Sequence, residues 1–159
     1  MEFRPLIRKQ KELTPEECLE LLRREKRGVL SVLGDGGYPY GTPMNHYYND
    51  EDGRIYFHCG RVGHRLDALR SNDKACFTCI DGGEPIPGSW ALQFRSVIVF
   101  GRVEIVDDPE RVVAISTALS HKFTDDESFI SEEIQRSGKA TQLLALTPEH
   151  ICGKKVKES

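Results

Sequence analysis

The spacing of apolar residues changes near residue 28, and this change separates an N-terminal helix from a series of strands. The apolar residues at positions 18, 19, 21 and 22 recur at helical spacing. Thr14 suits the N-cap, Pro15 the first helical position and Glu17 the capping box. The sequence therefore predicts a helix that starts at Thr14 and ends before Gly28.

Beyond residue 28, short apolar and β-branched runs alternate with turn residues, which is typical of strands joined by hairpins. The turns are expected at residues 35–37, which read Asp-Gly-Gly, and at residues 49–53. Pro39 and Pro43 each remove a ladder donor, so their strand should be interrupted, bulged or at a sheet edge. Strands are expected at residues 28–34, 38–48, 55–57, 74–80 and 92–106.

The remaining segments are expected to form one loop, one helix and a last strand pair. Residues 81–89 read as a loop that is long enough to reach a neighbouring subunit or to cover a site. Pro109 opens a helix to about residue 122, whereas residues 123–139 are polar and predict little helix. The final pair of strands is expected at residues 142–146 and 150–156.

Together these elements predict a mainly β protein. Six or seven strands, mostly antiparallel because their connections are short, with a few peripheral helices, indicate a closed or half-closed β-barrel. The 159 residues suit one domain, expected at residues 14–157, and residues 1–13 read as an aperiodic arm that is loose or laid over a neighbour.

Composition excludes several classes of partner. With 22 basic and 25 acidic residues mixed along the chain, the net charge of −3 provides no field for nucleic acid or an anionic membrane. No apolar run is long enough to span a membrane and no signal peptide is recognisable, so a cytoplasmic protein is expected. Cys76 and Cys79 lie three apart in a strand, on opposite faces, which favours structural thiols over a metal or redox pair.

The strongest candidate for chemistry is residues 55–70, IYFHCGRVGHRLDALR, which read as strand, loop and helix. Gly60 and Gly63 allow a close approach of backbone to a ligand. Arg61, His64 and Arg65 lie where the predicted helix starts, so cationic side chains and free N–H groups converge there. This pattern indicates a local site for an anion, most plausibly phosphate. The alternative is a surface turn with solvated charges.

Three segments in this order resemble a known family. YPYGTPMNHYY, then IYFHCGRVGHRLDALRSNDKACF, then QFRSVIVFGRVEIV resemble the FMN-binding split-barrel proteins related to pyridoxamine 5′-phosphate oxidase, and within them the nitroimidazole-resistance branch. The likeness covers about residues 12–155. It implies a homodimer with FMN in a groove between two barrels.

Position by position, the resemblance implies four groups of cofactor-binding residues. The phosphate would be held by Gly63, His64 and Arg65. The strand beside the isoalloxazine ring would be Thr42, Pro43, Met44, Asn45 and His46. The neighbouring strand end would contribute Phe57, His58 and Cys59. The long fifth strand, from the same or the partner subunit, would contribute Arg95 and Ser96.

Some of these positions depart from the oxidase pattern or keep an alternative reading. A lysine of the oxidase ring strand is His46 here, and a basic C-terminus for substrate is absent, so vitamin B6 oxidation is not expected. Asn45, His46 and His58 are candidate hydrogen-bond donors to the flavin. Alternatively, His46 points to solvent, Asn45 stabilises a bulge, and His58 is a barrel-end histidine. The role of Arg61 stays open.

Three functions are compatible with these residues. The first is an FMN-dependent oxidoreductase that passes electrons from reduced FMN to a small acceptor such as a nitro-aromatic compound, with His58 as general acid. The second is a non-enzymatic flavin or haem carrier or sensor, and the third an interaction scaffold without cofactor. No nicotinamide-binding fingerprint follows any predicted strand, so a pyridine nucleotide would bind only transiently.

Overall fold

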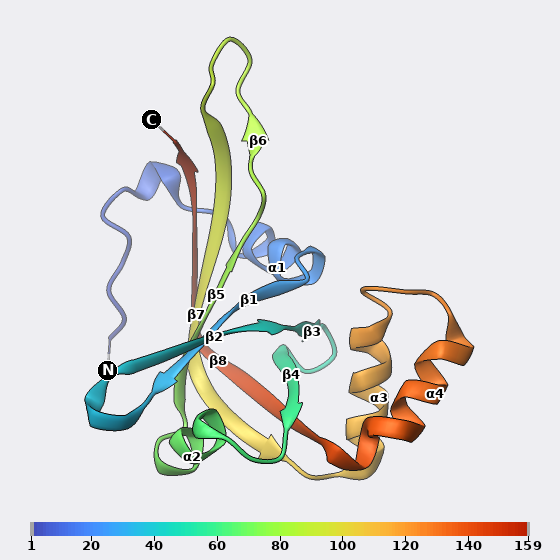
Figure 1. The fold of residues 1–159 in the computed structure, drawn as a ribbon. Coiled ribbons are helices and arrows are strands. Elements are labelled where there is room, and N and C mark those ends of the chain that lie inside the picture. Colours follow the sequence, from blue (N-terminus) through green and yellow to red (C-terminus); the bar gives the residue numbers. More distant parts are fainter. Residues whose placement is uncertain (1, 159) are drawn as a thin grey trace.

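One antiparallel sheet makes up most of the fold and curls until its two edges meet (Figure 1). The computed structural model describes residues 2–158. The strands are β1 (Arg27–Leu33), β2 (Pro39–Asn45), β3 (Tyr47–Asn49), β4 (Arg54–Gly60), β5 (Lys74–Ile80), β6 (Glu84–Pro85), β7 (Leu92–Val106) and β8 (Thr141–Lys157). Their order is β2-β1-β5-β7-β8-β4-β3, and β6 pairs with β7. The predicted antiparallel split β-barrel is confirmed.

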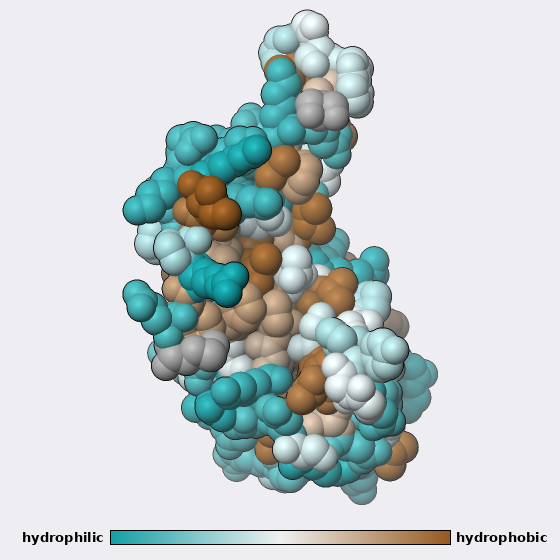
Figure 2. All heavy atoms as spheres, turned by 90° about the vertical axis from the view of Figure 1, so that its left-hand side faces the viewer, coloured by the Kyte–Doolittle hydropathy of each residue, from teal (hydrophilic) through white to brown (hydrophobic). Residues whose placement is uncertain are grey.

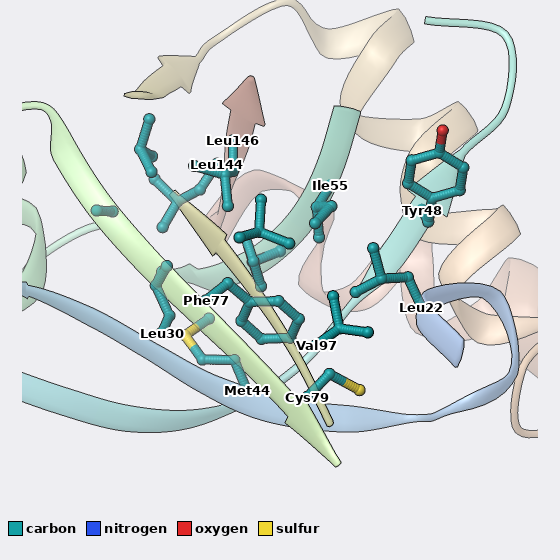
Figure 3. Close-up of a cluster of buried hydrophobic side chains, with 14 of the residues drawn as sticks. Leu22, Leu30, Met44, Tyr48, Ile55, Phe77, Cys79, Val97, Leu144 and Leu146 are labelled. Atoms are coloured by element: carbon teal, nitrogen blue, oxygen red, sulfur yellow. The ribbon is translucent and has the colours of Figure 1, made fainter. Parts of the chain in front are cut away.

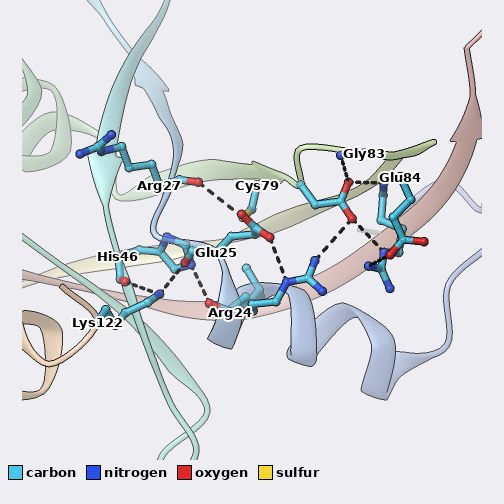
Figure 4. Close-up of polar contacts among 11 residues, drawn as sticks. Arg24, Glu25, Arg27, His46, Cys79, Gly83, Glu84 and Lys122 are labelled. Carbon is cyan, nitrogen blue, oxygen red and sulfur yellow. Dashed lines mark hydrogen bonds and ion pairs between the residues drawn. The ribbon is translucent and has the colours of Figure 1, made fainter. Parts of the chain in front are cut away.

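The barrel closes at His46, because β2 and β3 are two halves of one segment separated only by this residue. β2 pairs with β1 and β3 pairs with β4, so the segment changes partner at His46. The prediction of an interrupted edge strand is thus confirmed. The carbonyl of Leu22 lies 2.7 Å from Nε2 of His46. Lys122 Nζ donates to the carbonyls of His46, at 2.9 Å, and of Glu25, which fixes the junction (Figure 4).

Four helices surround the barrel: α1 (Pro15–Arg24), α2 (His64–Ser71), α3 (Pro109–Ser120) and α4 (Glu127–Ser137). Short 3-10 turns lie at Lys9–Lys11, Asp35–Gly37 and Gly138–Ala140. The predicted capping box of α1 is present, with Thr14 Oγ1 accepting from the Glu17 N–H and the Glu17 carboxylate accepting from the Thr14 N–H.

Side chains from both sides of the sheet are buried in two separate clusters. The first fills the barrel and includes Leu22, Leu30, Phe57, Phe77 and Leu144 (Figure 3). α1 and α2 contribute to it from opposite ends of the strands. The second cluster lies between the outer face of β4 and β8 and helix α3, and comprises Tyr56, Val106, Val112, Ile115, Leu143 and Ala145. Residues that alternate along β4 therefore face different clusters.

The prediction of little helix in residues 123–139 was wrong, since α4 occupies Glu127–Ser137. Asp126 caps α4 by accepting from the Phe129 N–H at 3.0 Å. Ile130 is only 2% exposed and holds the helix in place. The local signals for α4 are the N-cap Asp126 and the apolar residues at positions 129, 130 and 134, which the prediction from overall polarity did not use.

The predicted final pair of strands is one continuous strand, β8. Its partner β7 has 15 residues against the 17 of β8, and the register between them shifts at Phe100 and Gly101. Phe100 pairs with His150 whereas Gly101 pairs with Pro148, so the extra residue, Glu149, forms a bulge. The turn-like sequence Thr147-Pro148-Glu149 therefore forms a bulge within β8 and does not end the strand.

The N-terminal segment lies along β8 of its own chain. Phe3 stacks on His150 with ring centroids 4.7 Å apart, and Leu13 N–H donates to the Gly153 carbonyl. Apolar side chains gather in the middle of the face that this segment crosses (Figure 2). Among residues 2–158, no helix is both long and apolar enough to span a bilayer.

Candidate functional site

The loop before α2 has the open geometry that an anion requires. Gly63 has φ +135°, a conformation that favours glycine, and a Cβ at Gly63 or Gly60 would meet no atom within 4 Å. Helix α2 starts at the next residue, His64, so its first N–H groups and the positive end of its dipole face this loop. A phosphate oxygen can approach the backbone here without a steric clash.

Arg65 joins this loop to the predicted ring strand. Its Nη1 donates to Thr42 Oγ1 at 2.8 Å, although the two residues are 23 positions apart. Its Nε is buried and has no hydrogen-bond partner among the described residues. A buried guanidinium N–H without an acceptor is costly unless an anion or another acceptor satisfies it. This geometry fits a phosphate group between the start of α2 and β2.

His64 is held against the turn that follows β1. The backbone N–H of Asp35 donates to His64 Nε2 at 3.3 Å, the Asp35 carboxylate lies 3.5 Å from the same atom, and the imidazole packs on Tyr40. Since Nε2 accepts in this arrangement, the proton of the neutral ring is on Nδ1. Asp35 and Tyr40 were not singled out from the sequence. Strand alternation places Tyr40 on the face of Thr42, but nothing local indicates the approach of Asp35.

Residues of the predicted ring strand alternate between the core and the surface. Met44 and His46 point inward and are 6% and 0% exposed, whereas Pro43 is exposed. Asn45 accepts a hydrogen bond from Arg27 Nε at 2.9 Å. The alternative that His46 points to solvent is wrong. Its imidazole lies against Phe77 in the core, which leaves the backbone of β2, Pro43 and Asn45 as the accessible parts of this strand.

Burial lowers the pKa of His46 to about 3, and the nearby ammonium of Lys122 acts in the same direction. The imidazole is therefore neutral at physiological pH. A backbone carbonyl can only accept a hydrogen bond, so Nε2 of His46 carries the proton and donates to the Leu22 carbonyl. Nδ1 is then a buried acceptor without a partner among the described residues. His46 serves the junction of β2 and β3.

Of the three residues at the end of β4, Phe57 and Cys59 face the barrel core and His58 faces outward. Phe57 is fully buried against Phe77, and Cys59 packs against the same barrel core. His58 lies on the outer face of the strand, beside a cavity of about 280 Å³ whose other lining includes Ser116, Ser120 and Glu133. Burial lowers the pKa of His58 below its usual value. His58 and the pair Thr42–Arg65 thus lie on opposite faces of the sheet.

Arg95 and Ser96 are distant from the phosphate loop of the same chain. Strand pairing aligns Thr42 with Leu30, Phe77 and Val99 across the sheet. Arg95 lies four residues before Val99, about 13 Å along β7 at about 3.3 Å per residue. Its Nε donates to Asp81 at 2.9 Å. One subunit alone therefore does not bring Arg95 and Ser96 to Arg65.

Arg61 also points away from the phosphate loop. Its Nε donates to the Lys139 carbonyl at 2.8 Å, and Nη1 lies 3.8 Å from the Asp107 carboxylate. It therefore ties the loop to the start of β8 rather than adding charge beside Arg65.

The antiparallel sheet curls into a barrel that is split at His46, where one segment changes its pairing partner. This architecture is that of a split β-barrel. Within this class, the chain belongs to the pyridoxamine 5′-phosphate oxidase family, whose model matches residues 14–155. The family predicted from the sequence is thus confirmed. A comparison of the sequence with curated proteins gave no match.

Solved structures with the same fold come from several bacteria. A proposed 5-nitroimidazole antibiotic resistance protein from Bacteroides thetaiotaomicron superimposes with a TM-score of 0.75 at 18% identity, covering 92% of this chain and 87% of that one. An FAD-binding protein from Mesorhizobium loti gives 0.65 at 21% identity, covering 92% and 97%. The flavocytochrome Anf3 from Azotobacter vinelandii gives 0.68 at 20% identity, covering 89% and 66%. At these identities the likeness shows the fold.

Proposed function

We propose that this protein binds FMN and passes electrons from the reduced flavin to a small acceptor such as a nitro-aromatic compound. The observation that carries the proposal is Arg65, which bridges the start of α2 to Thr42 and keeps a buried Nε without a partner. Family membership and flavin-binding neighbours of the same fold support it. When bound, the flavin supplies the electron transfer, and the chain holds it, shields it and moves protons.

FMN, rather than FAD, suits the charges around the phosphate site. The N-terminus of α2, Arg65 and His64 together favour one terminal phosphate. Solved structures of the same fold include FAD-binding proteins, so the preference of the present chain for FMN over FAD has to be measured with both flavins.

Replacing Arg65 by Ala should weaken FMN binding by roughly ten- to a hundredfold, because a charge-assisted bond to phosphate contributes about 1.5–3 kcal/mol. Arg70→Ala is the matched control, since Arg70 lies on the same helix but is exposed and pairs with Asp67. Fluorescence titrations of FMN and FAD into both variants and the wild type measure the effect. Equal affinities of the wild type and Arg65→Ala for FMN would contradict the assignment.

The flavin ring is assigned to a groove shared by two subunits. Within one chain, Arg95 and Ser96 lie about 13 Å and about 10 Å along the sheet from the level of Thr42, so a second subunit is needed if all predicted residues are to surround one flavin. The outer faces of β1 and β5 also expose Val29, Leu33 and Ile80, at 39%, 49% and 52%. Exposed apolar side chains on one sheet face favour a homodimer.

His58 is assigned as the group that delivers a proton to the acceptor. Because it lies on the opposite face of the sheet from Thr42 and Arg65 of its own chain, this role requires a flavin whose phosphate the partner subunit binds. The cavity beside it, about 280 Å³, has room for a small molecule and is below the range of about 300–1,000 Å³ that larger ligands occupy. The hydroxyl groups of Ser116 and Ser120 provide polar contacts for the acceptor in the same cavity.

A further inference from the structure

Residues 81–91, here called the projecting hairpin, extend beyond the rest of the molecule. Figure 1 shows β6 and the start of β7 rising above the barrel, and Figure 2 shows their tip as a narrow projection. β8 ends at Lys157, opposite Gln93, and β6 contributes only two pairs with β7. Residues 86–91 lie beyond this ladder. A two-stranded hairpin without further cover is marginally stable in water.

The base of the projecting hairpin is nevertheless fixed. The side chain of Asp81 is only 6% exposed and accepts from the backbone N–H groups of Gly83 and Arg95 and from Nε of Arg95, at 2.9–3.1 Å. Arg24 of α1 adds a second guanidinium at 3.4 Å (Figure 4). These contacts set the direction in which the hairpin leaves the barrel.

Hydrogen bonds within the tip order its backbone, but its largest side chain, Trp90, is not covered by the rest of the molecule. Ser89 N–H donates to the Ile86 carbonyl at 3.0 Å, and Ala91 N–H donates to Ser89 Oγ at 3.1 Å. Trp90, the only tryptophan of the chain, is 82% exposed. A tryptophan held out on a preorganised element loses little entropy on binding and is the commonest kind of interface anchor.

We propose that Trp90 docks on a second copy of this chain, on the outer strip formed by Val29, Leu33 and Ile80. These three residues share one face of β1 and β5, because the inward residues between them are buried. Ile80 directly precedes the base of the projecting hairpin, so hairpin and strip form one continuous surface. In a dimer with two-fold symmetry, the hairpin of each copy contacts the strip of the other, so the contact occurs twice.

This inference rests on the proposed homodimer and adds the contact that holds it. The contact with a second copy would also cover the projecting hairpin, which is only marginally stable by itself. The tip, residues 86–91, contains no charged residue, so a nucleic acid or an anionic lipid is a poorer partner for Trp90 than the apolar strip.

Because Trp90 is the only tryptophan, its fluorescence reports on this contact directly. Full-length protein is diluted over several decades of concentration while sedimentation records its mass. The dimer should emit at a shorter wavelength than free tryptophan in water, and emission should move to longer wavelength as the dimer dissociates. Trp90→Ser and Ile80→Ser should each weaken dimerisation about tenfold or more.

Phe129→Ser is the matched control, because Phe129 is 54% exposed on α4, away from β1 and β5, and its loss should leave the dimer unchanged. Circular dichroism checks that each variant is folded. A dimer whose Trp90 emits as in water, and whose affinity survives Trp90→Ser, would overturn the hairpin contact but leave the dimer proposal standing. A monomer at all concentrations would overturn both, and with them the shared groove for the flavin ring, whereas the assignment of Arg65 to the phosphate is tested separately by the FMN titration.

Discussion

Single residues of this protein have roles that depend on the face they occupy. His46 and His58 are both candidates in the sequence, and both have a pKa lowered by burial, yet they occupy different environments. His46 is sealed in the core and bonded to a backbone carbonyl. His58 borders the cavity between β4 and helices α3 and α4. A comparison of their alanine variants therefore measures folding at His46 and chemistry at His58.

The stability of the fold should decrease in mild acid because of His46. An unfolded imidazole has a pKa of about 6.5, whereas that of folded His46 is about 3. Between these values only the unfolded chain takes up the proton, so stability is full above pH 6.5 and falls as the pH drops toward 3. From pH 7 to pH 5 the loss should be about 2 kcal/mol, at about 1.4 kcal/mol per pKa unit.

His46→Gln should remove most of this loss, because the amide keeps a donor for the Leu22 carbonyl but does not titrate. His121→Gln is the control, since His121 is exposed at the end of α3. Urea unfolding at pH 7 and pH 5 measures the difference. A wild-type protein and His46→Gln variant with the same pH dependence would rule out His46 as its source.

The acceptor reaction should depend on pH through His58. Its pKa lies below the usual value, so the imidazole is mostly neutral at pH 7 and its protonated, proton-donating form increases as the pH falls. Reoxidation of the reduced flavin by a nitro-aromatic compound should accelerate in mild acid. His58→Ala should lose this acceleration and react about 10²–10⁴-fold more slowly.

Rapid mixing of anaerobically reduced protein with the acceptor measures these rates, with FMN affinity checked first. His121→Ala serves as a control, because His121 lies outside the cavity and pairs with Glu127. If His58→Ala kept the wild-type rate and pH profile, the proton would have to come from another group or from water.

At the scale of elements, the long antiparallel pair of β7 and β8 shows how tertiary pairing overrides local signals. The sequence from Thr147 to Glu149 is typical of a turn, and the polar segment after α3 resembles a loop. In the structure β7 pairs with β8 along almost its whole length, and the turn-like residues form a bulge in β8 opposite Gly101. By contrast α1, with its capping box and apolar face, was predicted correctly because its signals are local.

Gly101→Ala should destabilise the barrel by about 1–3 kcal/mol or more, because overpacking at a backbone contact forces the strands apart. A Cβ there would lie 2.1 Å from the Thr147 carbonyl oxygen. Gly60→Ala is a matched control, since Gly60 also lies in a strand but a Cβ there meets nothing within 4 Å. Denaturant unfolding should show the loss for Gly101→Ala alone, and an equal stability of the two variants would show that the bulge tolerates a side chain.

At the scale of the whole molecule, the barrel brings together segments that no sequence window connects. Thr42 and Arg65 meet because β2 returns along β1 while α2 closes the end of the same barrel. The same closure keeps His58 and Arg95 away from that point within one chain. All the predicted residues can surround one flavin only if a second subunit contributes some of them, and the proposed contact between Trp90 and the outer strip would hold that subunit.

The sequence by itself determined the strand pattern, the first helix, the family and the candidate anion site. These depend on periodicity, caps, glycines and clustered charges, which are properties of neighbouring residues. Only the tertiary structure decided that His46 is buried, that His58 faces the α3–α4 cavity, and that Arg65 Nε lacks a partner. The direction of a side chain at a strand end, and the atoms that surround it, depend on residues distant in the chain, which the sheet brings into contact only when it closes.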